Sequence, residues 1–492
     1  MSKFYITTAI LYTNDLPHVG FALELIQADV LARYHRLMGD DVWFLTGTDE
    51  HGATVVKGAA KNNTEVEVFV DRIAEKTKEL TKLLNISNDD FIRTTDKVRH
   101  WPAAEKMWDK LVEAGDLYKK EYEGLYCVGH EAFIKKSDLV DGVCPLHKTE
   151  PEKVKEENWF FKLSKYKKEI KKLIESDELR IVPESRKKEI LNLLDDAEDV
   201  SFSRPSKDLK WGIPVPNDET QTMYVWADAL TNYISAIGYA QETEQFKKYW
   251  PADVHLVGKD IVRFHAMIWP AMLLSAGLPL PKALYIHGFI NVDGEKMSKT
   301  TGNVVDPFQL VEKYGPETVR YFLLREIPSG EDGDFSYKKL EERYNGDLAN
   351  GLGNLVQRVV TMIDGNLDGE LIHQSEKRKV KSAKLENYHK AIEDFRLHDA
   401  LGEVWKLVTE ANQYIDERKP WIEAKENPTR FLETMTTLTT MIHYAAYLLQ
   451  LFLPETAKKI ADVFGDDLNS KEVPENYKFI VKKGEPLFPR LS

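Results

Sequence analysis

The alternation of strand-like and helix-like patterns at the start of the chain constrains its fold more than any other feature. Residues 4–10 are rich in residues that favour strands, and residues 42–45 form a second apolar strand. Between them, residues 20–37 carry apolar side chains at helical spacing, and Gly39 fits a helix stop. A strand, a helix and a strand in this order is the βαβ unit of a parallel sheet, whose crossover is right-handed. We therefore expect an α/β fold with a Rossmann-type parallel sheet.

A chain of 492 residues is too long for one hydrophobic core, so we expect several domains. The same strand and helix patterns divide the chain into segments. In chain order we expect segments at 1–116, 117–222, 223–280, 281–345 and 346–492. The second segment contains both cysteines and interrupts the strand–helix alternation, which returns in the third, so it is expected to be an insertion between two halves of the sheet domain. The last segment is expected to be all-α, since it has helical periods at 350–363, 387–415 and 431–452.

Composition narrows the class of protein. Apolar residues make up 42% and aromatic residues 11% of the chain, which is ordinary for a globular protein. The sequence has no uncharged apolar stretch of about 18 residues and no secretory signal pattern at its start, so we expect a cytoplasmic protein without a membrane span. Two cysteines exclude a disulfide framework. A formal charge of −13 argues against wholesale binding of a polyanion but does not exclude local basic surfaces.

A loop between the first strand and the first helix, Pro17 to Gly20, predicts a phosphate site. Ligands of open α/β sheets bind at the carboxyl ends of the strands, and a helix N-terminus offers unpaired N–H groups to phosphate. Gly20 allows a base or ribose close to the backbone, and His18 can donate to a phosphate whose charge grows during a reaction. Taken alone, this pattern is more typical of an ordinary polar loop than of a phosphate site.

A second loop, from Gly294 to Gly302, contains Lys296-Met297-Ser298-Lys299 and follows a strand pattern. Two lysines three residues apart can fold over a triphosphate and neutralise the charge that develops as pyrophosphate leaves. The alternative for this loop alone is an exposed basic segment.

Together the two loops resemble the paired signatures of class I aminoacyl-tRNA synthetases, His-Ile-Gly-His and Lys-Met-Ser-Lys-Ser. Here the first signature is His18-Val19-Gly20-Phe21, so Phe21 stands where the family usually has its second histidine, and one nucleotide contact is lost or replaced. In the second signature Thr300 replaces serine and keeps the hydroxyl. The resemblance implies ATP-dependent activation of an amino acid, with His18, Lys296 and Lys299 in catalytic roles.

Further segments resemble the methionyl-tRNA synthetase family along nearly the whole chain: residues 7–12, 47–52, 224–230 and 258–265. By this resemblance a methionine pocket would be lined by Ile10, Tyr12, Trp226, Ala229, Leu230, Tyr233, Ile261, Phe264 and His265. Asp49 would hold the substrate ammonium. Aromatic and aliphatic walls suit a flexible thioether, and a buried carboxylate needs a cation partner. Each of these aromatic residues taken singly could be an ordinary core residue.

The same resemblance assigns ATP contacts to Gly20, Glu24, Gly258, Asp260 and His287, and places Mg²⁺ with the ATP. The implied reaction is attack of the methionine carboxylate on the α-phosphate, followed by transfer of methionine to the terminal ribose of tRNA(Met). Neither step needs a side-chain nucleophile, so we predict no covalent enzyme intermediate. The segment 281–345, with its lysine loop, would contact the tRNA acceptor stem.

Two Cys–His knuckles in the insertion predict a structural zinc site. Cys127 and His130 form the first and Cys144 and His147 the second, with about a dozen residues between them. Four such ligands can bind Zn²⁺ tetrahedrally. The family often has cysteine at the position of His130, and some members keep the knuckles without metal, so a metal-free knuckle is the alternative.

The helical C-terminal segment is predicted to bind the anticodon. Asn354 and Arg358 lie four residues apart on one helical face, and Trp421 follows a proline. At the matching positions the family reads the CAU anticodon; tryptophan can stack on a base while the other two bond base edges. A helix-surface pair and a half-buried tryptophan are the alternative. We see no appended dimerising module and expect a monomer.

Three rival functions remain open from the sequence. The chain could be another class I ligase, for leucine, isoleucine, valine or cysteine, which amino-acid-dependent pyrophosphate exchange would distinguish. It could be a nucleotidyltransferase with the same nucleotide motif, although its length and the Lys296 loop argue against that. It could also be an inactive tRNA-binding paralogue, for which Phe21 is a hint and the presence of Asp49 a counterargument.

Overall fold

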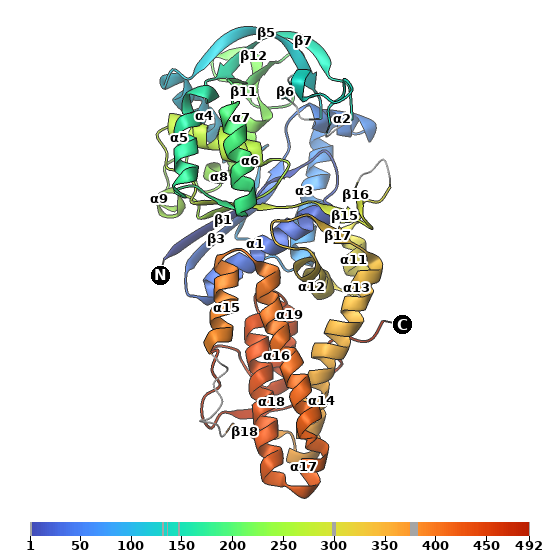
Figure 1. Cartoon of the computed structure of the whole chain (residues 1–492). Coiled ribbons are helices and arrows are strands. Elements are labelled where there is room, and N and C mark those ends of the chain that lie inside the picture. Colours follow the sequence, from blue (N-terminus) through green and yellow to red (C-terminus); the bar gives the residue numbers. More distant parts are fainter. Residues whose placement is uncertain are drawn as a thin grey trace. The chain divides into compact units, whose positions relative to one another are not determined.

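The computed structural model describes residues 2–129, 132–134, 136–145, 148–297, 302–373 and 382–491. The chain forms two compact units (Figure 1). Unit 1 comprises residues 1–28 and 35–287, and unit 2 comprises residues 29–34 and 288–492. Among the helices of the described ranges, none is long and apolar enough to cross a membrane.

Unit 1 is built on a seven-stranded sheet whose recorded pairings are all parallel, as predicted. Its strand order is β2 (Leu11–Tyr12), β3 (Asp41–Asp49), β1 (Lys3–Thr8), β13 (Val254–Gly258), β14 (Ala283–His287) and β8 (Arg180–Val182), with β4 (Asp90–Arg93) also paired to β3. The central strands β1, β13 and β14 are almost wholly buried, as expected for a parallel sheet that is covered on both faces, and most of their side chains are apolar or aromatic. Helix α1 (Val19–Leu37) connects β1 to β3, so the predicted βαβ unit is confirmed.

The other helices of unit 1 surround this sheet. They are α2 (Ala53–Lys61), α3 (Val66–Leu83), α4 (Trp101–Glu113), α5 (Leu163–Glu175), α6 (Glu184–Asp195), α7 (Val225–Ala229), α8 (Asn232–Ser235), α9 (Glu244–Tyr249) and α10 (Trp269–Ser275). Directly before α10, residues Phe264–Ile268 form a π-helix, η2. A π-helical turn inside a helix is frequently found at a functional site.

The segment 117–222 forms two antiparallel sheets of its own. One has the order β6 (Ala132–Ile134), β5 (Leu117–Cys127), β7 (Glu152–Phe161), β9 (Val200–Ser201), and the other β10 (Ser203–Pro205), β12 (Asp218–Met223), β11 (Pro214–Val215). The long pair β5 and β7 curves across one end of unit 1 (Figure 1), and the short 3-10 turn η1 (Lys136–Asp138) follows β6. Strand β8, however, lies within this segment and pairs with β14 of the main sheet, so part of the segment belongs to that sheet.

Unit 2 begins with a small sheet, β15 (Ile290–Val292), β16 (Glu295–Lys296) and β17 (Gly333–Phe335). Its helices are α11 (Pro307–Tyr314), α12 (Pro316–Glu326), α13 (Tyr337–Arg343), the π-helix η3 (Tyr344–Gly353), α14 (Asn354–Leu367), α15 (Ser382–Glu393), α16 (Leu397–Arg418), α17 (Pro420–Glu426), α18 (Pro428–Leu449) and α19 (Pro454–Phe464). A two-stranded sheet of β18 (Glu370–Ile372) and β19 (Lys478–Ile480) completes it. Helices α14, α16 and α18 run side by side (Figure 1).

The helical character expected after residue 346 is confirmed, with one change. The period predicted at 387–415 is two helices, α15 and α16, because the chain turns at Phe395, whose φ is +58°. A left-handed residue cannot continue a right-handed helix. Buried Leu397, Leu401 and Val404 then repeat at helical spacing on the core-facing side of α16.

Candidate active site

The carboxyl ends of the central strands bring several predicted nucleotide-binding residues together. Gly258 ends β13, His287 ends β14, and Glu24 lies in α1, which follows β1. Glu24 Oε1 accepts a hydrogen bond from the Ala9 backbone N–H (2.6 Å), and its Oε2 lies 2.9 Å from His287 Nε2. Since an ionised carboxylate only accepts, the imidazole Nε2–H donates. Burial raises the pKa of Glu24, and the hydrogen bond from His287 opposes that rise.

The conformation of the loop before α1 determines which nitrogen of His18 carries its proton. The Gly20 backbone N–H donates to His18 Nδ1 at 3.1 Å, so in the neutral ring the proton is on Nε2. Desolvation lowers the pKa of His18, against the opposing charge of Asp260, and this favours the neutral ring. The neutral ring therefore has one donor, Nε2–H, that can bond a ligand.

Two glycines of this region tolerate no side chain without displacing a neighbour. A Cβ on Gly20 would lie 2.9 Å from His18 Cε1, and one on Gly258 would lie 2.7 Å from Asp260 Oδ1. Both distances are shorter than a carbon–carbon contact or a carbon–oxygen contact allows. The glycines thus let His18 and Asp260 fold back against the main chain at the edge of the sheet.

Three of the aromatic side chains predicted to line the methionine pocket contact one another in unit 1. The rings of Trp226 and Phe264 are stacked, with centroids 3.9 Å apart and planes at 7°, and His265 meets Trp226 edge-on at 5.9 Å. Phe264 and His265 belong to the π-helix η2, and the wider turn allows both side chains to join one wall. A stacked pair beside an edge-on ring is a suitable surface for a thioether.

The His265 ring is held in one tautomer by two hydrogen bonds. Its Nδ1 lies 3.0 Å from the Ile261 carbonyl oxygen, which only accepts, so Nδ1–H donates. Nε2 therefore accepts from the Tyr233 hydroxyl at 2.7 Å. Burial lowers the pKa of His265 to about 4, so the ring is neutral at physiological pH. Burial also raises the pKa of Tyr233, with smaller contributions from the nearby charges of Glu24 and Asp49.

The remaining predicted pocket residues all lie in unit 1. Tyr12 of β2 is the register partner of Asp49 at the end of β3, and Thr13 N–H donates to the Asp49 carbonyl at 2.8 Å. The Asp49 side chain is buried. One hydrophobic cluster contains Ile10, Tyr12, Trp226, Leu230, Tyr233, Ile261 and Phe264, and Ala229 is buried at the end of α7. Most of the predicted pocket residues thus belong to the hydrophobic core of unit 1, and the pocket itself stays a prediction.

The lysine loop is presented by a tight hairpin of unit 2. Strands β15 and β16 are joined by Asp293 and Gly294, whose φ angles are +49° and +81°. Two positive φ values in a two-residue loop are the geometry for which an Asp-Gly sequence is favoured. Lys296 is exposed at the end of β16, with its Nζ 5.7 Å from the centre of the Phe289 ring. Lys299, predicted to act with it, lies outside the described residues.

The predicted anticodon residues cluster on the helices of unit 2. Asn354 is exposed at the start of α14, and Arg358 is one turn further along. The Arg358 guanidinium lies 5.8 Å from the centre of the Trp421 ring and donates to Asp416 at 3.0 Å. Trp421 is 47% exposed, which is unusual for so large an aromatic side chain. An exposed indole beside a guanidinium is a platform on which a base can stack.

Only two of the four predicted zinc ligands fall within the described residues, where no group of three potential metal ligands occurs; His130 and His147 lie outside. Cys127 ends β5 and Cys144 lies in a turn, and both side chains are buried although much of the surrounding segment is exposed. The Cys144 carbonyl accepts from Lys148 N–H at 2.8 Å. Cysteine sulfur is a suitable ligand for Zn²⁺, so the chemistry of these two side chains fits the predicted site.

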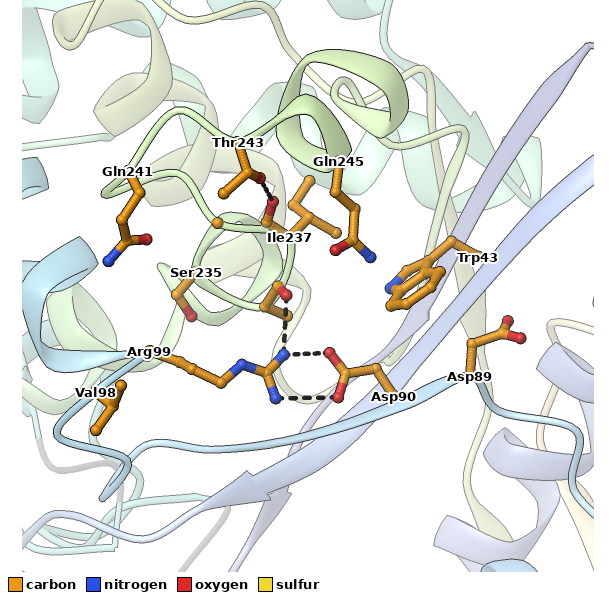
Figure 2. Close-up of a pocket in the computed structure, with 12 residues that line it drawn as sticks. Trp43, Asp89, Asp90, Val98, Arg99, Ser235, Ile237, Gln241, Thr243 and Gln245 are labelled. Carbon is orange, nitrogen blue, oxygen red and sulfur yellow. Dashed lines mark hydrogen bonds and ion pairs between the residues drawn. The ribbon is translucent and has the colours of Figure 1, made fainter.

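A separate pocket of about 520 Å³ lies at the amino ends of β3 and β4 (Figure 2). Arg99 crosses it, paired with Asp90, and also donates to the Ala236 carbonyl at 2.9 Å. Its other lining residues include Trp43, Gln241 and Gln245. None of the predicted site residues lines this pocket, so it is distinct from the candidate active site.

Comparisons with known proteins agree with this geometry. The family described as tRNA synthetases class I (M) matches residues 4–150 and 134–360, and the anticodon binding domain of methionyl tRNA ligase matches residues 368–484. The chain belongs to the methionyl-tRNA synthetase family. The methionine–tRNA ligase of Caldanaerobacter subterraneus subsp. tengcongensis is 46% identical, over 99% of this chain and 79% of that relative. The enzyme of Brucella suis is 42% identical, over 99% of this chain and 98% of its own.

Solved structures of the methionyl-tRNA synthetase family have the same fold. Mycobacterium tuberculosis methionyl-tRNA synthetase in complex with methionyl-adenylate superimposes with a TM-score of 0.94 at 39% identity, covering 100% of both chains. Its apo form superimposes with a TM-score of 0.87 at 37% identity, over 100% of this chain and 99% of the other. The fold class predicted from the sequence is thereby confirmed.

Methionyl-tRNA synthetase signatures did not reveal every residue that shapes these sites. Phe21, the departure from the usual signature, is buried in α1 and packs in the core. Ala9 contributes through its backbone N–H, and Asp416 reaches Arg358 from a different helix. Neither of these two contacts has a sequence signal, because a backbone donor is independent of side-chain type and Asp416 is 58 residues from its partner.

Proposed function

We propose that this chain is a methionine–tRNA ligase, which forms methionyl-adenylate from methionine and ATP and transfers methionine to the 3′ end of tRNA(Met). The observation that carries the proposal is the wall of Trp226, Phe264 and His265 in the same unit as the glycine-lined nucleotide edge. Aminoacylation of tRNA(Met) with labelled methionine tests it: charging is expected with methionine, and failure of the purified protein to charge would refute it.

In the first step the methionine carboxylate oxygen attacks the α-phosphorus, the bond to the bridging oxygen breaks, and pyrophosphate leaves. Asp49, buried at the end of β3, would bind the substrate ammonium. The thioether would lie against Trp226, Ala229, Leu230, Tyr233, Ile261, Phe264 and His265, with Ile10 and Tyr12 closing the pocket from the β1–β2 side. The neutral His265 ring places no charge beside an apolar substrate group.

ATP would bind along the carboxyl edge of β1, β13 and β14. The Nε2–H of His18 donates to a phosphate oxygen, and Glu24, Gly258, Asp260 and His287 hold the nucleoside, with Gly20 leaving space for it. Lys296 and Lys299 neutralise the departing pyrophosphate. The ATP phosphates would bind with Mg²⁺, which would supply further charge neutralisation.

In the second step a hydroxyl of the terminal ribose attacks the acyl carbon of the adenylate, and AMP leaves. Selection of the tRNA is assigned to unit 2, where Trp421 stacks on an anticodon base and Asn354 and Arg358 bond base edges. The salt bridge of Arg358 with Asp416 holds the guanidinium over the edge of the indole in advance of binding.

Three further proposals accompany this function. A structural Zn²⁺ would be bound by Cys127, His130, Cys144 and His147, and it would join the two knuckles of the insertion. The protein would act as a cytoplasmic monomer without a membrane partner. The domain boundaries would follow the expected segments, with the insertion at 117–222 contributing β8 to the main sheet and the anticodon-binding domain beginning at 346.

A further inference from the structure

Three segments of unit 1 meet at the carboxylate of Asp228 in α7. Its Oδ2 lies 2.6 Å from His51 Nδ1, and its Oδ1 lies 2.7 Å from His100 Nε2. All three side chains are at most 3% exposed. Burial alone would raise the pKa of Asp228, but the two histidines lower it, so the group is a carboxylate at neutral pH. Since a carboxylate only accepts, each ring donates one N–H to it.

The positions of these residues in the chain connect the bridge to the methionine pocket. His51 follows Asp49, the proposed ammonium ligand, by two residues. Asp228 stands between Trp226 and Ala229, which line the proposed thioether wall. The bridge therefore joins the segment that would bind one end of methionine to the helix that would bind the other.

The outer ends of the bridge are also anchored. His100 Nδ1 lies 2.9 Å from Ser235 Oγ, and Arg99, its neighbour, donates to the next carbonyl, that of Ala236 (Figure 2). The segment that contains His51 is held at Glu50, whose side chain accepts from Arg93.

Two tryptophans enclose the His51 ring. Trp101 and Trp211 meet it edge-on at 6.0 Å and 5.8 Å, and Trp211 Nε1–H also donates to the Glu50 carbonyl at 2.6 Å. These contacts limit rotation of the His51 ring away from Asp228. The positions of His51 and α7 are therefore coupled.

We propose that Asp228 is a positioning residue for methionine activation. Through His51 and His100 it holds the Asp49 segment at a fixed separation from the wall on α7, so that the ammonium and the thioether of methionine are bound together. This inference rests on the proposed function. It predicts that loss of the bridge weakens methionine binding specifically. A bridge that served only folding would affect stability alone.

Asp228→Asn tests the proposal, because the amide keeps the shape but replaces one acceptor oxygen with a donor that faces a histidine N–H. In methionine-dependent ATP–pyrophosphate exchange, KM for methionine is expected to rise about 10- to 100-fold, the effect of losing a hydrogen bond to a charged group, while KM for ATP stays within about twofold. Asp116→Asn is the matched control. Asp116 is another fully buried carboxylate of unit 1 and accepts from Lys165, Tyr166 and Ser275.

The control is expected to lower the melting temperature while leaving KM for methionine unchanged. The proposal would be overturned if the Asp228 and Asp116 variants had equal KM values for methionine. It would also be overturned if KM for methionine and KM for ATP rose in parallel in the Asp228 variant. If the Asp228 variant fails to fold, a comparison of His51→Asn with His51→Ala tests the proposal instead. The asparagine amide can donate from near the position of His51 Nδ1, so His51→Asn is expected to have a lower KM for methionine than His51→Ala. Identical KM values for the two variants would overturn the proposal. Absence of exchange in the unsubstituted protein would refute the proposed function instead.

Discussion

Replacing Gly20 by alanine tests whether the position of His18 controls the activation step. The new Cβ would lie 2.9 Å from His18 Cε1 and 3.0 Å from Nδ1, whereas carbon–carbon contacts are comfortable at about 3.5 Å or more. The ring must therefore move by about half an ångström, which breaks the 3.1 Å hydrogen bond from Gly20 N–H to Nδ1. That bond also selects the Nε2–H tautomer that would donate to phosphate.

The magnitude follows from these two losses. A neutral hydrogen bond contributes about 1 kcal/mol, and a misplacement of about 1 Å at a reacting centre can cost about 100-fold in rate. We expect kcat of methionine-dependent ATP–pyrophosphate exchange to fall about 10- to 100-fold, which is roughly 1.4 to 2.7 kcal/mol. KM for methionine should change little, because the substitution lies outside the methionine pocket.

Two comparisons make this prediction refutable. Gly402→Ala, in α16, is the matched control, since a Cβ there meets nothing within 4 Å, and it should leave exchange unchanged. If Gly20→Ala acts through the imidazole, then adding it to His18→Ala should cause little further loss. A normal exchange rate for Gly20→Ala, or full additivity of the two substitutions, would refute the reasoning.

Further predictions concern the other sites. Trp421→Ala should lower tRNA(Met) charging about 5- to 150-fold, the effect of one lost base stack, and spare exchange; equal loss of both activities would contradict the anticodon assignment. The pKa of His265 falls from about 6.5 unfolded to about 4 folded, so the unfolded chain binds the proton first and stability is lost as the pH falls from 6.5 towards 4. The free energy of unfolding falls by about 3 kcal/mol across this pH range. Urea titrations at several pH values should show a steeper fall for the native protein than for His265→Gln. Parallel plots of unfolding free energy against pH would exclude His265 as the cause. Metal analysis without chelators should find one zinc per chain and less in Cys127→Ser, whereas metal-free native protein would rule out the structural site.

Elements with a strong local pattern were predictable from the sequence. The helix expected at 20–37 is α1, and strand β5 begins at residue 117, where the insertion was expected to start. Strand β8 was not predicted, because three residues carry no periodicity and its pairing with β14 joins segments about a hundred residues apart. The break between α15 and α16 was missed as well, since the left-handed conformation of Phe395 has no compositional signal.

In the candidate site too, features with a local or family signal were predictable and contacts between distant segments were not. The pocket residues were named through the family resemblance, and the hairpin that presents Lys296 has a local signal in Asp293-Gly294. The bridge between His51, Asp228 and His100 was not foreseen, because its members are 128 and 177 residues apart. The family segments that contain His51 and Asp228 do not indicate that these two side chains meet. Such non-local polar contacts become visible only when the fold brings the segments together.

The most direct test of the central claim is amino-acid-dependent ATP–pyrophosphate exchange with the purified protein, measured across methionine, leucine, isoleucine, valine and cysteine. The pocket of Trp226, Phe264 and neutral His265 predicts rapid exchange with methionine and little with the other four. Exchange driven by one of the other amino acids, or no exchange with any of them, would contradict the account.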